Sequence, residues 1–163
     1  MGVLWKSTIR SGSEYFIYEI KWDGIRCIAY IDDQSTDLRN KRNMSLLSRF
    51  PELESLFKGR SRKCILDGKL NVFVNGKPDF YEVQRRTVLT DPFKIQLAYK
   101  KYPANFVAYD ILYFIDKPVT ELPLMERKKL LNEVISESDI LSKYRYVEAN
   151  GIAMYKFAEV NGL

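Results

Sequence analysis

The stretch YEIKWDGIRCIAYI, residues 18–31, places four charged side chains inside an otherwise apolar run. Before the Asp23-Gly24 pair, side chains alternate between a polar set that includes Glu19 and Lys21 and an apolar set, as they do along a strand with one solvated face. Asp-Gly between two strand-like runs is a strong hairpin signal. The stretch therefore predicts two paired antiparallel strands that fold back at Asp23-Gly24.

The composition is that of an ordinary globular chain, long enough for one domain with its own core. Its 163 residues are 46% hydrophobic and 29% charged, with a net charge of +5 and a pI near 9.1. This balance fits an anionic partner such as nucleic acid or nucleotide, and fits a merely basic protein equally well. Histidine is absent, which excludes Ser-His-Asp and Cys-His catalysis and removes the commonest zinc ligand.

The two cysteines and the length of the apolar runs indicate the cellular compartment of the protein. Cys27 and Cys64 lie in apolar runs without CxxC spacing, which predicts buried, reduced thiols in a cytoplasmic protein. No apolar run approaches the ~18–20 residues that a membrane-spanning helix needs. We therefore expect no interaction with a membrane.

Turn and cap signals divide the rest of the chain. Asn75-Gly76 predicts a hairpin, and Asp79 and Asp91 predict helix N-caps. Strands are expected at 64–74, 104–115 and 144–148, and helices at 50–57, 79–88, 91–102, 125–135 and, capped by Asn150, up to Gly162. Because strands and helices mix without strict alternation, the sequence favours an α+β fold of mainly antiparallel sheets with flanking helices.

The full spacing E-x-K-x-D-G-x-R gives the opening stretch a chemical interpretation. The simpler interpretation is a solvated hairpin face, on which a Glu19–Lys21 ion pair contributes under ~1 kcal/mol. However, a lysine becomes a nucleophile where burial and a nearby cation such as Arg26 lower its pKa. The planar fork of an arginine also binds phosphate, and Gly24 lets the backbone approach a ligand closely.

The segment KWDGIR, residues 21–26, resembles motif I of the covalent nucleotidyltransferases, K-x-D-G-x-R. Four longer blocks resemble the ligase domain of bacterial end-joining ligases among the ATP-dependent DNA ligases: SRFPELESL (48–56), PDFYEVQRRT (78–87), VAYDILYFID (107–116) and LPLMERKKLL (122–131). The resemblance implies the DNA ligase/mRNA capping enzyme catalytic-domain fold, which is ATP-grasp-like.

The resemblance also implies a reaction. Lys21 would attack the α-phosphate of ATP, release pyrophosphate and become lysyl-AMP, with Mg²⁺ assisting. AMP would then pass to the 5′-phosphate of a DNA nick, where the 3′-hydroxyl displaces it. The implied substrate is nicked or broken double-stranded DNA, in DNA repair and recombination, and DNA end-joining proteins are implied partners.

Further positions of the adenylate site follow from the resemblance. Glu19 matches the acid that helps to select adenine, and its alternative role is that of a surface acid. Ile20 matches the residue whose backbone lies against the base, and Arg26 matches the arginine that contacts the AMP sugar. Tyr109 matches the aromatic residue that stacks on adenine, for which a π-face is suited.

Other charged positions remain open between two roles. Arg39 matches the motif Ia arginine that contacts the nucleotide and its phosphate, with Arg42 as the alternative and a solvated loop arginine as the simpler interpretation. Asp110 lies in an apolar strand and needs a partner, because an unpaired buried carboxylate costs several kcal/mol. A further set could contact DNA phosphates or form solvated helix faces: Gln84, Arg85, Arg86, Lys94, Lys100 and Lys101.

Two departures from the family pattern set limits on activity. Family motif III reads D-G-E, whereas this chain has Asp67-Gly68-Lys69. The missing glutamate serves the ribose and the metal in the family, and lysine has no acceptor for Mg²⁺, so no metal ligand is assigned and weak adenylation is expected. The chain also ends before motifs IV and V, which predicts that residues 1–163 are the N-terminal part of an adenylation domain, incomplete at the C-terminus and without an OB-fold domain.

Three functions stay open at this point. The first is the adenylation-domain fragment of an ATP-dependent DNA ligase. The second is a catalytically inactive nucleotide- or DNA-binding remnant, which Lys69 and the missing motifs favour. The third is an RNA ligase or a GTP-using capping enzyme, against which the end-joining-like blocks argue.

Overall fold

The computed structural model describes residues 16–59, 62–148 and 151–161, and its elements form two compact units. The smaller unit combines the two ends of the chain, Met1–Trp22 and Tyr144–Leu163. The larger unit is Asp23–Lys143. The boundary between Trp22 and Asp23 falls inside the K-x-D-G-x-R segment.

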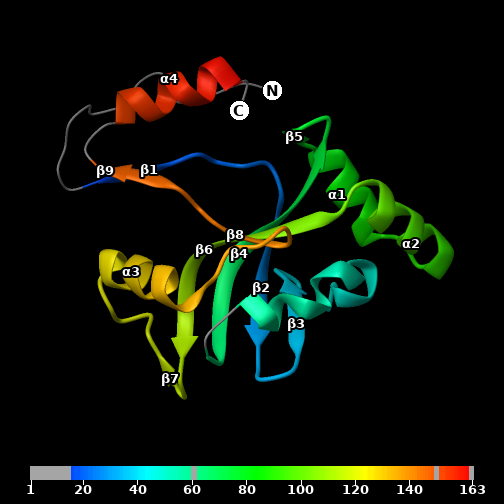
Figure 1. Cartoon of the computed structure of the whole chain (residues 1–163), viewed down its shortest axis with the longest axis horizontal. Coiled ribbons are helices and arrows are strands. Elements are labelled where there is room, and N and C mark those ends of the chain that lie inside the picture. Colours follow the sequence, from blue (N-terminus) through cyan, green and yellow to red (C-terminus); the bar gives the residue numbers. More distant parts are fainter. Residues whose placement is uncertain (1–15, 60–61, 149–150, 162–163) are drawn as a thin grey trace. The chain divides into compact units, whose positions relative to one another are not determined.

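A seven-stranded sheet forms the larger unit (Figure 1). Its main path runs in the order β3 (Thr36–Asn40), β2 (Ile25–Ile31), β4 (Cys64–Val74), β6 (Ala104–Phe114) and β7 (Lys117–Pro118), while β5 (Lys77–Pro78) pairs with β4 and β8 (Leu141–Lys143) with β6. Every pairing is antiparallel except that of β6 with β8. The expected α+β class with a mainly antiparallel sheet is thus confirmed.

Helices cover this sheet, and the local signals explain where they begin. They are the 3₁₀ helices η1 (Leu47–Arg49) and η2 (Pro51–Gly59) and the α-helices α1 (Phe80–Thr87), α2 (Pro92–Lys101) and α3 (Leu124–Val134). As predicted, the Asp79 carboxylate accepts from the backbone N–H of Glu82 at 2.8 Å, and Asp91 caps α2. Among the helices described, none is both long and apolar enough to cross a membrane.

Figure 1 shows α1 and α2 together at one end of this sheet and α3 at the other.

The main core lies on the sheet face that η1, η2 and α1 cover. Its fully buried members include Ala29 on β2, Leu66 on β4 and Phe106 on β6, with Phe50 beside η2. Burial of the larger of these side chains, Leu66 and the two phenylalanines, contributes roughly 1.5–3 kcal/mol each. The predicted burial of the two reduced cysteines, on β2 and β4, is confirmed.

A buried ion pair fixes α1 against η2. The guanidinium of Arg86 donates to both oxygens of Glu52, at 2.7 and 3.0 Å, and both side chains are at most 1% exposed. Arg86 also lies 4.5 Å from the ring centroid of Phe50. Because Arg86 is inside the protein, both roles left open for it, a contact with DNA phosphates and a solvated helix face, are wrong.

Backbone groups complete the surroundings of this ion pair. Arg86 donates to the carbonyl oxygens of Arg49 and Tyr102, at 3.1 and 3.2 Å. Glu52 accepts from the backbone N–H of Ala104, the first residue of β6, at 2.9 Å. The pair therefore joins α1, η2 and the start of β6.

The smaller unit contains one short sheet and one helix. β1 (Ile17–Glu19) pairs antiparallel with β9 (Tyr146–Glu148), and α4 (Gly151–Asn161) packs on β1. The close approach needs Gly151, since a Cβ there would lie 2.4 Å from the ring of Tyr18. The predicted cap at Asn150 and stop at Gly162 lie outside the described residues.

The predicted hairpin at Asp23-Gly24 is wrong, because β1 pairs with β9 and not with β2. A tight Asp-Gly hairpin turn needs positive φ at the glycine, and among the described glycines only Gly76 has it. Gly24 serves close packing instead, since a Cβ there would lie 2.2 Å from Oδ1 of Asn71. The predicted Asn75-Gly76 hairpin is confirmed, with φ of 52° and 77°.

Replacing Arg86 with methionine tests the buried ion pair. The Arg86→Met variant should lose about 3–5 kcal/mol of unfolding free energy, because Glu52 is left as an unpaired buried carboxylate. Urea denaturation followed by circular dichroism measures the change. The neighbouring Arg85→Met is the matched control: the exposed Arg85 pairs with the half-buried Glu82 at the surface, so its loss should be under ~1 kcal/mol. Equal losses in the two variants would contradict this account.

Candidate functional site

Asp67 is the centre of a polar cluster on the sheet face opposite the main core. Its Oδ1 accepts from Nε of Arg26 at 3.1 Å and from the hydroxyl of Tyr109 at 2.5 Å, and its Oδ2 accepts from Nη2 of Arg26 at 2.5 Å. Asp67 is only 4% exposed, whereas the Arg26 side chain is 66% exposed. The structure thus brings together two of the predicted site residues, Arg26 and Tyr109, through one carboxylate.

The carboxylate changes the acid–base properties of both neighbours. Its hydrogen bond to Arg26 raises the pKa of the guanidinium. Burial, followed by the hydrogen bond and the negative charge of Asp67, raises the pKa of the Tyr109 phenol above its ordinary value of 10. Both groups therefore remain protonated hydrogen-bond donors at neutral pH.

A β-bulge places Tyr109 beside Asp67. In the β4–β6 register, Asp67 faces Asp110 and Gly68 faces Ala108, so Tyr109 is the extra residue of β6. Such a bulge redirects a side chain relative to the regular strand. The carbonyl oxygen of Tyr109 accepts from Nζ of the buried Lys128 on α3, at 2.6 Å. Sequence reasoning missed Lys128, which lies in an otherwise unremarkable lysine pair of LPLMERKKLL.

Asp110 has the partner that its place in an apolar strand required. Arg127 on α3 donates to its two oxygens, from Nε at 2.8 Å and from Nη2 at 3.0 Å. Arg127 also donates to the carbonyl of Leu122, and the hydrogen bond to Asp110 raises the pKa of its guanidinium. Two adjacent residues of α3, Arg127 and Lys128, therefore hold the bulged part of β6.

Arg39 lies on the same sheet face, on the edge strand β3. It is opposite Ile28 of β2, which in turn is opposite Asp67 of β4. Its Nε donates to Asp37 at 2.7 Å, and it contacts Asn43. The alternative residue, Arg42, is exposed in the turn after β3. Of the two arginines, Arg39 is the one that the sheet holds on the face of the Asp67 cluster.

Glu19, Ile20 and Lys21 lie in the smaller unit. Glu19 ends β1 opposite Tyr146, and Lys21 is exposed two residues later. The backbone N–H of Trp22 donates to the carbonyl of Ile20 at 3.0 Å and to the hydroxyl of Tyr144 at 3.2 Å. The site predicted from sequence is thus divided: three of its residues belong to this unit, and Arg26, Arg39 and Tyr109 belong to the larger one.

The donors around Asp67 do not fit the Mg²⁺ that the resemblance implies. Mg²⁺ takes oxygen ligands in octahedral geometry, usually one or two carboxylates with phosphates and waters. Both oxygens of Asp67 already accept hydrogen bonds, and Lys69, two residues on along β4, brings a further cation. Within the described ranges there is no group of three or more His, Cys, Asp or Glu side chains that could hold a metal ion.

Comparison with known proteins gives consistent matches. A family model described as ATP dependent DNA ligase domain matches residues 5–158. The Bacillus subtilis protein "Bifunctional non-homologous end joining protein LigD" is 35% identical over 130 residues, which are 76% of this chain and 21% of that protein. The "SPbeta prophage-derived DNA ligase-like protein LigB" of the same organism is 30% identical over 92% of this chain and 52% of its own length.

Solved structures give the same fold. The ligase domain of LigD from Mycobacterium tuberculosis superposes with a TM-score of 0.66 at 21% identity, covering 90% of this chain and 44% of that one. A Lig E DNA ligase gives a TM-score of 0.55 at 18% identity, covering 93% and 52%. The chain spans 21 to 34% of the length of the first curated relatives that it matches.

The raised pKa of Tyr109 can be checked by its ultraviolet spectrum. The difference between the ultraviolet spectra of the wild type and of Tyr109→Phe should show no tyrosinate absorbance at pH 10, where an ordinary tyrosine is half ionised. Asp67→Asn should move that ionisation to lower pH, because the negative charge disfavouring the phenolate is gone. Circular dichroism at the same pH serves as the control for folding. Half ionisation of Tyr109 at pH 10 in folded wild type would contradict the assignment.

Proposed function

Since the chain belongs to the ATP-dependent DNA ligase domain family, we propose that it forms the nucleotide-binding part of a ligase adenylation domain, with Lys21 as the nucleophile. The observation that carries this proposal is the shared contact of Arg26 and Tyr109 with Asp67. These three residues come from three separate strands, β2, β4 and β6. A structural ion pair alone would not need an aromatic hydroxyl and a largely exposed guanidinium at one carboxylate.

In the proposed reaction, the amine of Lys21 attacks the α-phosphorus of ATP. A bond forms between the α-phosphorus and the lysine nitrogen. The bond between the α-phosphorus and the oxygen that bridges to the β-phosphate breaks, and pyrophosphate leaves. Arg26 binds the sugar of the adenylate and Tyr109 supplies the aromatic surface for adenine. Glu19 and Ile20 select the base, and Arg39 contacts the phosphate. In DNA sealing, AMP then passes to a 5′-phosphate and is displaced by the 3′-hydroxyl.

Nicked or broken double-stranded DNA is the proposed substrate. The printed name of the Bacillus subtilis relative, which refers to non-homologous end joining, supports a role in DNA repair and recombination with end-joining proteins as partners. The free and buried state of both described cysteines supports the cytoplasm as the compartment.

A second candidate function is a catalytically inactive nucleotide- or DNA-binding remnant. Lys69 favours it, because this cation faces Arg26 across the β2–β4 ladder where the family pattern has the glutamate that serves the metal. Without that acid, the negative charge that develops on the transferring phosphate loses a source of stabilisation.

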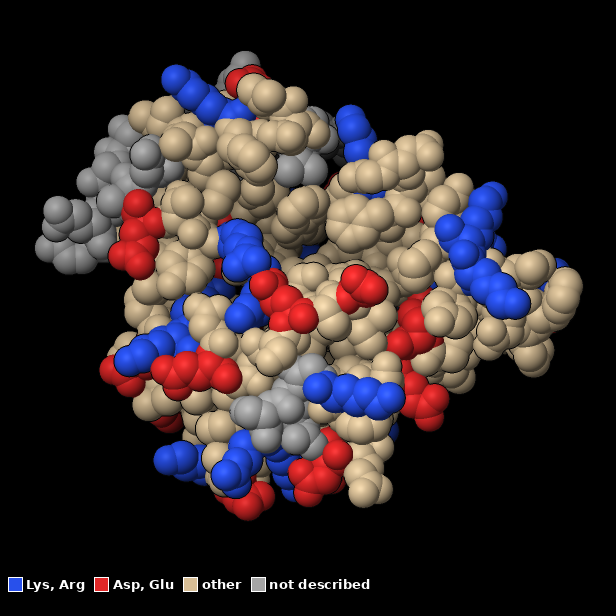
Figure 2. Space-filling model, viewed as in Figure 1, with Lys and Arg blue, Asp and Glu red and all other residues tan. Residues whose placement is uncertain are grey.

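The DNA is proposed to contact α2, whose exposed face carries Lys94, Lys100 and Lys101. Figure 2 shows Lys and Arg side chains along this end of the larger unit. Lys94 and Lys101 line a hollow of about 340 Å³ between α1 and α2, together with Arg85. The one acid there, Glu82, is paired with Arg85. A phosphodiester backbone matches such a surface.

Covalent adenylation can be measured with ATP labelled at the α-phosphate. Label should attach to the wild type weakly, be abolished in Lys21→Ala and be retained in Lys41→Ala, which removes another exposed lysine. Lys69→Glu should raise labelling by a factor on the order of ten or more, since it restores an acid at the metal side. Mass spectrometry locates the adduct. Labelling that survives Lys21→Ala would refute Lys21 as the nucleophile, and ATP binding with no adduct in any variant would favour the inactive remnant.

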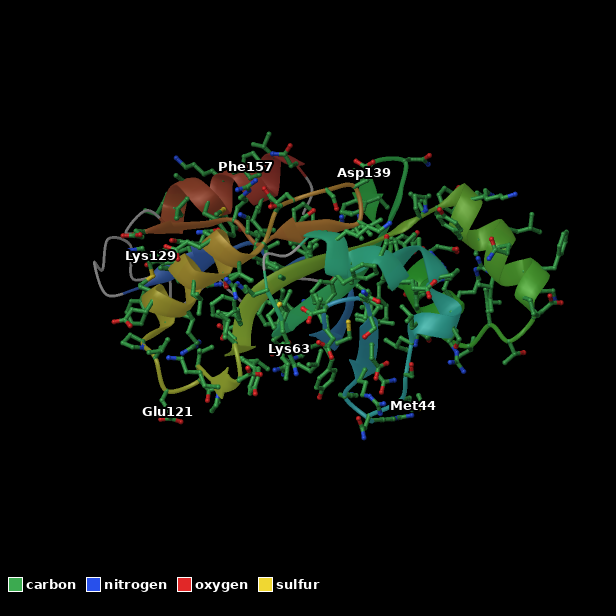
Figure 3. All side chains as sticks on the ribbon, turned by 60° about the horizontal axis from the view of Figure 1, so that its bottom comes forward. Met44, Lys63, Glu121, Lys129, Asp139 and Phe157 are labelled. Carbon is green, nitrogen blue, oxygen red and sulfur yellow. The ribbon has the colours of Figure 1, made fainter. Side chains whose placement is uncertain are left out.

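The DNA surface can be examined by charge reversal on α2. Lys94→Glu with Lys101→Glu should weaken binding to nicked duplex DNA and lower the slope of log affinity against log salt by about 0.9 for each lost phosphate contact. Fluorescence anisotropy across a salt series gives both quantities. The matched control is Lys117→Glu on β7 with Lys129→Glu on α3, which changes the net charge equally. Figure 3 labels Lys129 on α3. An equal loss in both pairs would mean that only overall charge matters.

A further inference from the structure

Two large apolar side chains lie exposed on one face of α2. Phe93 is 70% exposed and Leu97 is 52% exposed. They are four positions apart, so they are neighbours on the helix surface. The face of α2 that packs on the protein is a different one and carries the buried Ile95 and Ala98. A single exposed apolar residue is common, but an apolar pair rimmed by charged residues is typical of a binding surface.

Lysines flank the Phe93–Leu97 pair on both sides. With about 3.6 residues per helical turn, Lys94 and Lys101 lie on one side of the pair and Lys100 on the other. All three lysines are exposed. Nζ of Lys101 lies 5.1 Å from the ring centroid of Tyr102, a contact that does not neutralise its charge. Figure 2 shows Lys and Arg side chains next to uncharged surface at this end of the larger unit.

Two acids lie beside this face, and each already accepts hydrogen bonds. Asp91 caps α2 and accepts from the backbone N–H groups of Phe93 and Lys94, at 2.8 and 3.3 Å. Glu82 accepts from Nε and Nη2 of Arg85, at 2.9 and 2.6 Å. The sequence of α2, PFKIQLAYKK, contains no acidic residue. Because its three lysines outnumber the capping aspartate, the face keeps a positive charge that is complementary to a polyanion.

The hollow between α1 and α2 continues this face. Leu97, Ala98 and Tyr102 give the hollow apolar walls, and Lys94 and Lys101 also line it. Its volume of about 340 Å³ lies within the range of ligand pockets, roughly 300–1,000 Å³. A nucleobase, which presents two apolar faces, is small enough to enter it.

Apolar and cationic side chains in this combination suit single-stranded DNA better than a duplex. In a duplex the faces of the bases are stacked on one another, and a protein reaches base edges and phosphates. An unpaired base exposes its face, and aromatic rings beside lysines are the usual receptors of single strands. The lysines of α2 can bind the phosphates of either form, whereas Phe93 and Leu97 gain little from a regular duplex.

We propose that α2 binds single-stranded DNA, with unpaired bases on Phe93 and Leu97 and phosphates on the three flanking lysines. This inference rests on the proposed function, in which the surface of α2 contacts DNA. It specifies the class of DNA as breaks or nicks that carry an unpaired extension. The lysines supply affinity for any DNA backbone, and the apolar pair selects unpaired bases.

Fluorescence anisotropy of the whole chain tests the inference with two labelled probes, a single-stranded oligothymidylate and a blunt duplex of the same length. Phe93→Ala with Leu97→Ala should weaken binding to the single strand roughly tenfold or more, and should change the duplex affinity less than about twofold. The slope of log affinity against log salt should stay as in the wild type, because the phosphate contacts remain. Phe93→Trp should keep the single-strand affinity and Phe93→Leu should lower it, since stacking needs a ring.

The matched control is Phe157→Ala with Val160→Ala, which removes two exposed apolar side chains from α4 in the smaller unit. Figure 3 labels Phe157. Both affinities should be unchanged in this variant. A single-strand loss equal to that of Phe93→Ala with Leu97→Ala would overturn the assignment to α2.

The remaining outcomes separate this inference from the proposed function. Single-strand affinity unchanged by Phe93→Ala with Leu97→Ala, or an equal loss for the duplex, would overturn the inference and leave the duplex contact standing. Unchanged single-strand affinity with a loss of self-association in sedimentation would assign the face to a second copy of the chain, and would likewise overturn it. Wild type that binds the duplex but no single strand would overturn the inference alone, even if a variant fails to fold. Wild type that binds neither probe nor nicked duplex would overturn the proposed DNA contact itself.

Discussion

The buried ion pair between Arg86 and Glu52 is the constraint on which the larger unit depends. Neither charge can be left alone inside the protein, because an uncompensated buried ion costs several kcal/mol. The pair therefore forces α1, η2 and the start of β6 into one arrangement, with Ala104 as the third point of attachment. Since β6 also carries Tyr109, the ion pair on one face of the sheet helps to position the polar cluster on the other face.

The strand β4 connects that framework to the site. Its Asp67-Gly68 pair uses both faces of one strand: the carboxylate meets Arg26 and Tyr109, while the glycine leaves room for the ring of Phe106. A Cβ at Gly68 would lie 2.4 Å from that ring. Hence the same dipeptide serves the site on one side and the core on the other, and a substitution at the glycine would disturb both.

Local signals predicted the elements well because the chemistry that decides them is local. The aspartate caps of α1 and α2 and the Asn75-Gly76 hairpin depend on residues within one turn, and all three were confirmed. Asp23-Gly24 failed because the partner of β1 is β9, at the far end of the chain, and a turn signal carries no information about distant pairing.

The charged residues show the same limit. Burial alone required a partner for Asp110, but only the fold identifies it as Arg127. Arg85 and Arg86 are neighbours in one basic run, yet one is exposed and the other fully buried. The pattern of charges cannot distinguish them, since the partner that draws Arg86 inside lies 34 positions away. The bulge at Tyr109 likewise depends on the register between two strands.

The two thiols of the sheet have a consequence for observing its motions. Cys27 on β2 and Cys64 on β4 are buried on the core face, and burial raises the pKa of the Cys27 thiol. In the closed sheet neither offers a reactive thiolate to a reagent. Modification must wait until the two central strands expose that face, so the rate of thiol labelling follows the opening equilibrium of the sheet centre. The two native thiols thus serve as internal probes for the stability of the strands that hold the cluster.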